Sequence, residues 1–232
     1  MLRLREGTSR RHTDSSGLET WMTFDSGDRK DRFCDGFRSL QSLNEKSLAP
    51  GQAIPTRSRE NVETLTYVMD GILLHEDDRG HSGVLHAGEF QLMSAGRGMR
   101  HHRLNGSQVD LVHILEGRFQ PDSRGETPEC VQKRFTAADR KRVFCLVASP
   151  DALQSPFHMR EDIRVYSSLP DRGCHLIHAL TPGRQAWLHV VRGRIQLENL
   201  VLIAGDGVAF QDEISVSVTA LEPSDLLLFD LA

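Results

Sequence analysis

Two glycine-bounded stretches decide the fold of this 232-residue chain: GQAIPTRSRENVETLTYVMDG at residues 51–71 and GEFQLMSAGRGMRHHRLN at residues 88–105. The segment ETLTYVMDGILL, at residues 63–74, is rich in β-branched and large apolar residues. Asp70-Gly71 interrupts this segment, and Asp-Gly between two such runs is a strong hairpin signal. Residues 51–105 therefore predict short antiparallel strands joined by tight turns.

This pattern recurs in the second half of the chain. YVMDGILL at residues 67–74 matches HVVRGRIQ at 189–196, and LHAGEFQLM at 85–93 matches LIAGDGVAF at 202–210. An internal repeat in a chain of strands indicates two copies of one β-architecture. We therefore predict an all-β protein with few short helices, built from two stacked β-barrels at residues 1–130 and 131–232.

The composition excludes several classes of protein. Apolar residues make up 38% of the chain and charged residues 26%, with a net charge of −4, so nothing favours electrostatic capture of nucleic acid. No apolar run approaches the roughly 20 residues needed to span a bilayer. The first residues lack the apolar core of a secretory signal. We expect a cytoplasmic protein that binds neither nucleic acid nor a membrane.

The cysteines and several histidines show no metal-binding pattern. Four cysteines are far apart and form no CxxC or Cys/His cluster: Cys34, Cys130, Cys145 and Cys174. This spacing disfavours a zinc site, and in a reducing compartment it predicts free thiols. His75, His81 and His86 lie in the hairpin region and are expected to face solvent, because polar residues near turns usually do.

The spacing of the two stretches resembles the two-part motif of the cupin β-barrels. In the first part, Gly, five residues, His-x-His, Glu and Gly correspond to Gly51, Arg57-Ser58-Arg59, Glu63 and Gly71. In the second part, the frame is Gly88, Ser94-Ala95-Gly96, His101 and Asn105. The segments ETLTYVMDG, QLMSAGRGMRH and the terminal LLLFDL are similar to those of the pirin-like proteins. This resemblance covers essentially the whole chain and implies a bicupin.

The resemblance also identifies the positions of a metal site. In pirin-like proteins the N-terminal barrel binds one ion of the Fe, Ni, Mn or Cu type through two histidines of the first motif and a His-x-Glu pair of the second. Those positions are Arg57, Arg59, His101 and Arg103 here. A guanidinium has no lone pair to offer a metal. We therefore expect no metal cofactor, and we disfavour the metal-dependent quercetin 2,3-dioxygenase activity known in the family.

Strand alternation places Arg57 and Arg59 on one face, and His101 and Arg103 on one face of another strand. Buried arginines need anionic partners. Either nearby acids pair with them and plug the barrel, or the arginines outnumber the acids and the cavity binds an anion. His101 is the candidate catalytic acid or base. The predicted ligand-binding residues are Arg57, Arg59, Glu63, His101, Arg103, His113 and Glu116.

Two functions from different classes remain open, and the sequence does not decide whether the protein is an enzyme. The leading hypothesis is a metal-free regulatory protein that binds a small anionic ligand or a protein partner in an arginine-lined pocket. The alternative is an enzyme acting on a small phenolic or anionic substrate. It would be a quercetinase-like dioxygenase with a rearranged metal site around Glu63 and His101, or a metal-free acid–base catalyst using His101. A structural partner protein is a third class.

Overall fold

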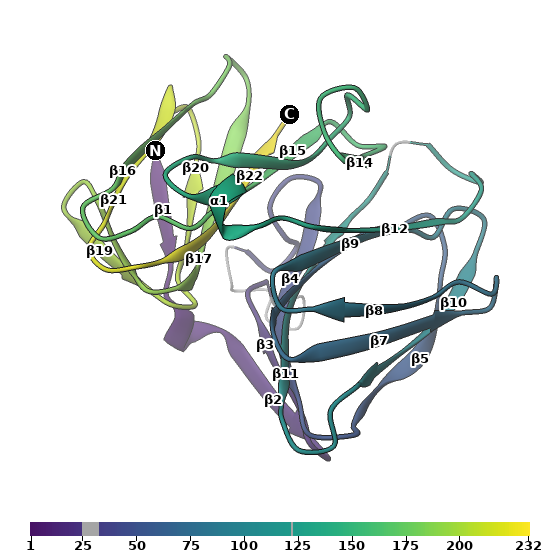
Figure 1. The fold of residues 1–232 in the computed structure, drawn as a ribbon. Coiled ribbons are helices and arrows are strands. Elements are labelled where there is room, and N and C mark those ends of the chain that lie inside the picture. The colour runs from purple at the N-terminus through teal and green to yellow at the C-terminus, as the bar shows by residue number, and fades with distance from the viewer. Residues whose placement is uncertain (25–32, 122) are drawn as a thin grey trace. The chain divides into compact units, whose positions relative to one another are not determined.

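The protein is built almost entirely of β-strands, as predicted (Figure 1). The computed structural model describes residues 1–24, 33–121 and 123–232. The chain divides into two compact units: an N-terminal unit, Arg11–Phe135, and a C-terminal unit, which combines Met1–Arg10 with Thr136–Ala232. Each unit consists of a seven-stranded and a four-stranded sheet, so each predicted barrel is realised as two sheets.

The N-terminal unit is antiparallel throughout its described strand pairs. Its seven-stranded sheet has the order β12-β9-β6-β11-β4-β3-β2, and its four-stranded sheet the order β5-β10-β7-β8. The strands are β2 (Arg11–Ser15), β3 (Leu18–Met22), β4 (Leu40–Leu48), β5 (Ala53–Arg59), β6 (Glu63–Asp70), β7 (Ile72–Asp77), β8 (Ser82–His86), β9 (Glu89–Ser94), β10 (Met99–Asn105), β11 (Val112–Phe119) and β12 (Glu129–Arg134).

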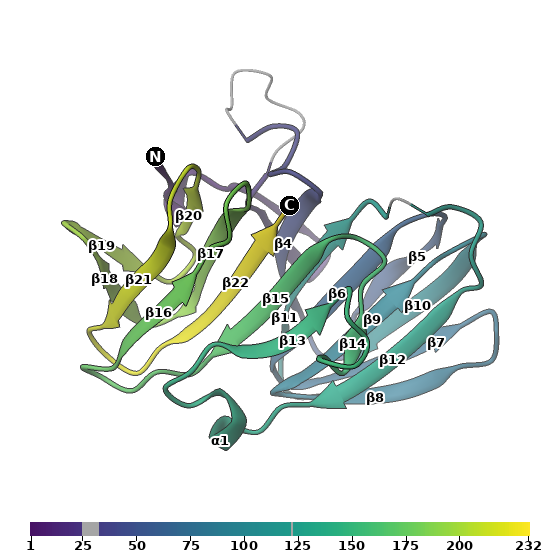
Figure 2. The same cartoon turned by 90° about the horizontal axis from the view of Figure 1, so that it is seen from above.

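The C-terminal unit also has a seven-stranded and a four-stranded sheet, with one parallel pair, β13 and β14, and is seen from above in Figure 2. Its sheets have the orders β1-β20-β17-β22-β15-β13-β14 and β16-β21-β18-β19. The elements are β1 (Leu2–Arg5), η1 (Gly7–Ser9), α1 (Ala137–Arg140), β13 (Cys145–Ser149), β14 (Phe157–His158), β15 (Ile163–Ser168), β16 (His175–Ala179), β17 (Gln185–Arg192), β18 (Arg194–Leu197), β19 (Leu200–Ile203), β20 (Gly207–Phe210), β21 (Ser215–Ala220) and β22 (Asp225–Leu231).

The unit boundaries differ from the predicted division at residue 130. The first strand, β1, pairs with β20, with Leu2 opposite Phe210, so the start of the chain belongs to the C-terminal unit. Strand β12 pairs with β9, with Cys130 opposite Met93, so the N-terminal unit extends to Phe135. Both differences arise from pairing between strands distant in sequence, which local patterns do not reveal.

The matching glycines of the repeat occupy the same kind of turn. Gly71, between β6 and β7, has a φ of 78°, and Gly193, between β17 and β18, has a φ of 83°. A Cβ added to Gly71 would lie 2.5 Å from the carbonyl oxygen of Leu111, and one added to Gly193 would lie 2.4 Å from the Oγ of Ser224. Side chains are disfavoured at both positions by backbone conformation and by space.

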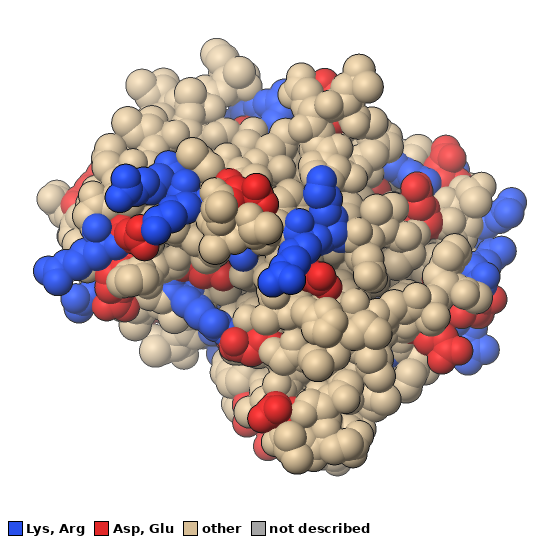
Figure 3. Space-filling view, in the orientation of Figure 1, with Lys and Arg blue, Asp and Glu red and all other residues tan. Residues whose placement is uncertain are grey.

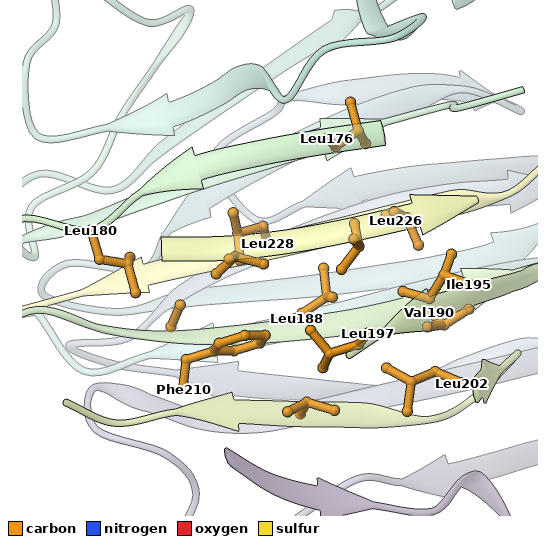
Figure 4. Close-up of a cluster of buried hydrophobic side chains, with 14 residues drawn as sticks. Leu176, Leu180, Leu188, Val190, Ile195, Leu197, Leu202, Phe210, Leu226 and Leu228 are labelled. Atoms are coloured by element: carbon orange, nitrogen blue, oxygen red, sulfur yellow. The ribbon is translucent and has the colours of Figure 1, made fainter. Parts of the chain in front are cut away.

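The two units fill their interiors differently. In the C-terminal unit, one continuous cluster of buried apolar side chains lies between the sheets (Figure 4). In the N-terminal unit, one of the apolar clusters is formed by Leu48, Ile54, Val68, Leu73, Leu85, Val112 and Ile114, with Leu18 packed against it. The same unit also buries the polar residues described below.

Charges of both signs are mixed on the face of the molecule seen in Figure 3, where Lys and Arg side chains are interspersed with Asp and Glu side chains. No helix in the described part of the chain is long and apolar enough to cross a membrane.

Candidate functional site

The candidate site is a cavity of about 410 Å³ in the N-terminal unit. It contains five cationic side chains and no carboxylate among its lining residues. Those residues are Thr13, Ser15, Leu18, Thr20, Met22, Asn44, Lys46, Ile54, Pro55, Arg57, Arg59, His101, Arg103 and Arg118. Leu18 and Ile54 also belong to or pack against the apolar cluster, so the cavity has an apolar side as well as a cationic one.

Strand β10 brings the two motifs together. It runs between β5 and β7, where His101 pairs with Arg57 on one side and with Asp77 on the other. Along β10, alternate side chains are buried, and these include His101 and Arg103. Arg103 pairs in register with His75 of β7. The alternation predicted from sequence therefore directs His101 and Arg103 into the unit.

A β-bulge shapes the arginine side of the cavity. His101 lies opposite Arg57, but Arg103 lies opposite Ile54, so two residues of β5, Pro55 and Thr56, face the single residue between them. Proline is tolerated here because β5 is an edge strand and a bulge interrupts the ladder. The bulge allows Ile54 and Arg57, three residues apart, both to line the cavity.

Glu116, on β11, holds three of the cations in place. Its Oε2 accepts hydrogen bonds from Lys46 Nζ at 2.8 Å and from Arg103 Nη2 at 2.6 Å. Its Oε1 accepts bonds from Arg118 Nη2 at 2.6 Å and Nε at 2.9 Å. Burial alone would raise the pKa of Glu116, but the three cations hold that pKa well below its usual value. Glu116 is therefore ionised and fully committed to internal ion pairs.

Arg57 and Arg59 have no carboxylate partner in the part of the chain that the structure describes. Within the described residues neither takes part in an ion pair, and both line the cavity. Arg57 is exposed and Arg59 is half-buried, which places them where the cavity meets solvent. Burial, followed by the neighbouring Arg118, lowers the pKa of Arg59. These two guanidinium groups can accept an external anion without breaking an existing pair.

His101 is a neutral imidazole in this setting. It is 7% exposed, and burial, followed by the charge of Arg103, lowers its pKa to about 3. Its Nε2 lies 3.5 Å from Arg103 Nη2, and its Nδ1 has no hydrogen-bond partner among the described residues. A histidine with this pKa can accept a hydrogen bond near neutral pH, but it carries no proton to donate as an imidazolium.

Of the seven residues predicted to bind a ligand, the structure brings together Arg57, Arg59, His101, Arg103 and Glu116. It places the other two predicted site residues elsewhere. Thr66 accepts a hydrogen bond from Arg103, and Glu63, three residues earlier on β6, lies on the opposite face of that strand. There Glu63 accepts a hydrogen bond from Ser94 Oγ at 2.8 Å. His113 lies beside Trp21, with its Nε2 2.7 Å from Glu45 Oε1.

Lys46, Arg118 and His75 are residues of the interior that the sequence analysis did not identify. Lys46 and Arg118 line the cavity. Lys46 is two residues from Leu48, and Arg118 is two residues from Glu116, so strand alternation places each on the same face as its neighbour and could have identified both. His75 was expected at the surface, and that prediction is wrong, because it is only 4% exposed. His75 is two residues from buried Leu73 on β7 and therefore lies on the same face of the strand. His81 and His86 are exposed, as expected.

Comparison with known families agrees with this two-unit architecture. Residues 6–117 match the Pirin family, and residues 146–231 match a family described as the quercetinase C-terminal cupin domain. A protein of Escherichia coli K12 named quercetin 2,3-dioxygenase is 33% identical over 231 residues, covering 100% of this chain and 99% of the relative. A pirin-like protein of Caulobacter vibrioides is 33% identical over 197 residues, or 84% of each chain.

Solved structures give the same relationship. The crystal structure of YhhW from Escherichia coli is 33% identical and superposes with a TM-score of 0.94, covering 100% of this chain and 98% of YhhW. A second structure, described as the bacterial pirin YhhW in complex with nickel(II), has a TM-score of 0.91 and covers 99% of YhhW. The nickel complex contradicts our expectation that no metal cofactor is involved, since a full-length relative binds a metal.

Three of the four positions expected from the motif nevertheless carry side chains that cannot bind a metal. Three of them are guanidinium groups, which offer no lone pair, and the fourth is His101. Across the described residues, no group of three or more His, Cys, Asp or Glu side chains is arranged to hold a metal ion. The residues present at these positions therefore do not fit a metal ion of the kind that YhhW binds.

Family membership follows from the agreement of fold and sequence over the full length. The N-terminal unit corresponds to the Pirin model and the C-terminal unit to the quercetinase C-terminal model. Full-length identity of 33% to the protein of Escherichia coli leaves no part of the chain outside the relationship. The chain belongs to the pirin family of cupin-fold proteins.

Proposed function

We propose that the N-terminal unit binds a small organic anion, either a carboxylate or a phenolate, in its cationic cavity. The observation that supports this most directly is the charge around the cavity: five cationic side chains line it, and the carboxylate of Glu116 pairs with three of them. Arg57 and Arg59 have no such partner among the described residues. Guanidinium groups bind planar oxyanions in a bidentate manner.

The cavity also has an apolar side, which points to an aromatic or aliphatic body behind the acidic group. Leu18, Met22 and Ile54 line it together with the cations. Neutral His101 can accept a hydrogen bond from a phenolic hydroxyl. A phenolic acid satisfies both sides of the cavity, and its charged group would meet the arginines near the mouth.

A second candidate function is oxidation of a phenolic substrate, favoured by the relatives named quercetin 2,3-dioxygenase. The nickel complex of YhhW supports a metal in that activity for the family. In this chain the metal would need ligands other than Arg57, Arg59 and Arg103. Binding of the phenolic anion is common to both functions, so we test it first.

The test compares 3,4-dihydroxybenzoate with its uncharged amide by isothermal titration calorimetry. We expect the carboxylate to bind more tightly than the amide, and the Arg57→Gln/Arg59→Gln variant to lose about tenfold or more in affinity, since a hydrogen bond to a charged group contributes about 1.5–3 kcal/mol. The matched control is Arg97→Gln/Arg100→Gln, which removes two exposed arginines that do not line the cavity. Equal affinity for acid and amide, or unchanged affinity in the first variant, would refute the proposal.

A further inference from the structure

One group in the cavity is an amine rather than a guanidinium. Lys46, on β4, is 7% exposed and lines the cavity together with Arg57, Arg59 and Arg103. An arginine stays protonated and does not act as a nucleophile under ordinary conditions, whereas a lysine amine does once it loses a proton. Lys46 is therefore the side chain in this cavity with the capacity for covalent chemistry.

The surroundings of Lys46 favour release of that proton. Burial is the main cause that lowers its pKa from 10.5 to about 8; Glu116 opposes the shift, and Arg103 and Arg118 reinforce it. An ordinary lysine has a pKa of about 10.4, so almost all of it is protonated at pH 8. At that pH about half of the Lys46 amine would be neutral and nucleophilic.

The position of Glu116 also suits conversion of the Lys46 ammonium into a protonated imine. Glu116 accepts a hydrogen bond from Lys46 Nζ at 2.8 Å and is itself held by Arg103 and Arg118. A protonated imine carries the same single positive charge as an ammonium. Its remaining N–H can keep the bond to Glu116, so the ion pair survives the conversion.

We propose that Lys46 forms a protonated imine with the carbonyl carbon of a small oxo acid whose carboxylate is bound by Arg57 and Arg59. This inference rests on the proposed function, because the same arginines hold the anion. It narrows the ligand class to acids that carry an aldehyde or ketone. The imine, which hydrolysis reverses, would add a covalent bond to the charges that hold the ligand and would lengthen its residence in the cavity.

The reaction balances without an oxidant or a reductant. The neutral amine attacks the carbonyl carbon, a C–N bond forms, and the C–O bond then breaks. Counted from the ammonium form, two of its protons leave with the carbonyl oxygen as one water molecule. The product is the protonated imine, with the charge of the starting ammonium.

The test is reductive trapping in the full-length protein. The probe is 4-oxobutanoate with sodium cyanoborohydride, followed by peptide mass spectrometry. We expect the reduced adduct to form on Lys46 at least about tenfold faster than on Lys133 or Lys141, which serve as internal controls. Lys141 pairs with Asp171 at the surface. Labelling of Lys46 should rise with pH around 8.

Four controls test the role of the carboxylate, the arginines, the amine and the shared cavity. Butanal, which lacks the carboxylate, should label Lys46 more slowly than 4-oxobutanoate, and Arg57→Gln/Arg59→Gln should remove that preference. Lys46→Arg keeps a cation beside Glu116 but should form no adduct at this position. Excess 3,4-dihydroxybenzoate should protect Lys46 if both ligands share the cavity.

The outcomes also distinguish this inference from the proposed function. If 3,4-dihydroxybenzoate binds but Lys46 is labelled no faster than Lys141, the imine is refuted and anion binding stands. If Lys46 is labelled equally fast by butanal and 4-oxobutanoate, Lys46 is reactive but the oxo-acid class is refuted. If neither binding nor selective labelling occurs, both proposals fail.

Discussion

The interiors of the two units differ although their strands follow the same repeat. The C-terminal unit is filled by leucine, valine, isoleucine and phenylalanine side chains, including Leu188, Leu197 and Leu228 (Figure 4). The N-terminal unit is apolar in one part of its interior and ionic in another. The same architecture therefore supports two kinds of interior.

The repeat makes this comparison specific. Counting from the equivalent glycines Gly71 and Gly193, the apolar pair Val68 and Leu73 corresponds to Val190 and Ile195, which are also apolar. By the same count, Thr66 corresponds to Leu188, and His75 to Leu197. Glu116 pairs with Thr66 across neighbouring strands, and Leu228 pairs with Leu188 in the same way. Glu116 and Leu228 are therefore equivalent positions.

This difference shows that the fold does not require buried charges at these particular positions. Burying an ion costs several kcal/mol, and well-packed apolar residues often serve stability at least as well. The C-terminal unit has leucine at the positions equivalent to Thr66, His75 and Glu116. It keeps an ionic cluster elsewhere, where Asp230 pairs with Arg184 and His178. The charges around Glu116 are therefore not required at these positions by the architecture, which is consistent with the proposed anion site.

The largest expected effect comes from removing the centre of the ionic interior. Glu116→Ala should lower the free energy of unfolding of the N-terminal unit by about 3–5 kcal/mol, because three cations lose their carboxylate. The corresponding Leu228→Ala should cost the C-terminal unit about 2–5 kcal/mol through the cavity it leaves. Urea unfolding can follow each unit separately, through Trp21 in a Trp187→Phe background and through Trp187 in a Trp21→Phe background.

A pH series sharpens this result. The pKa of Glu116 is lowered in the folded state, so its contribution to stability is present near neutral pH and is lost as the pH falls below about 4.5. Glu116→Gln, which has a similar shape, should remove that part of the acid dependence. If Glu116→Ala and Glu116→Gln both unfold like the parent protein, the ionic cluster does not stabilise the unit.

An intermediate effect is expected when the motif positions receive metal ligands. Arg57→His/Arg59→His/Arg103→Glu should bind nickel(II) at least about tenfold more tightly than the parent protein, since three groups without lone pairs become donors. Calorimetry measures the affinity, and plasma mass spectrometry measures the metal retained after dialysis. The control Arg57→Gln/Arg59→Gln/Arg103→Gln removes the same charges without adding strong donors. Equal nickel affinity in the two folded triple variants would show that the motif positions are misaligned.

The smallest effect is expected at His75. Its Nδ1 has no hydrogen-bond partner within the described residues, and its Nε2 has only long contacts, to Cys130 Sγ at 3.7 Å and Asp77 Oδ2 at 3.8 Å. Burial lowers its pKa, so it is a buried neutral imidazole. His75→Leu places the residue found at position 197 and should change stability by no more than about 1 kcal/mol, towards a more stable unit. The reverse change, Leu197→His, should cost about 1–3 kcal/mol. A marked loss of stability in His75→Leu would mean that the imidazole has a structural role.

Much of the site could be predicted because it follows from local spacing. Arg57 and Arg59 are two residues apart, as are His101 and Arg103, and alternation in a strand puts each pair on one face. Glu63 and His113 did not join them. His113 and Glu116 are three residues apart on β11, so they lie on opposite faces of that strand. Glu63 and Thr66 are also three residues apart, on β6, and lie on opposite faces for the same reason.

By itself, the sequence determined the all-β class, the internal repeat and the arginines at the motif positions, because glycine turns and strand alternation are local properties. It was wrong about the metal, since a full-length relative binds nickel(II). Only the tertiary structure decided that β1 completes the C-terminal unit, that Lys46 and Arg118 meet at Glu116, and that Arg57 and Arg59 remain unpaired within the described residues. These features depend on contacts between strands distant in the chain, where burial and charge are set by neighbours that no local pattern records.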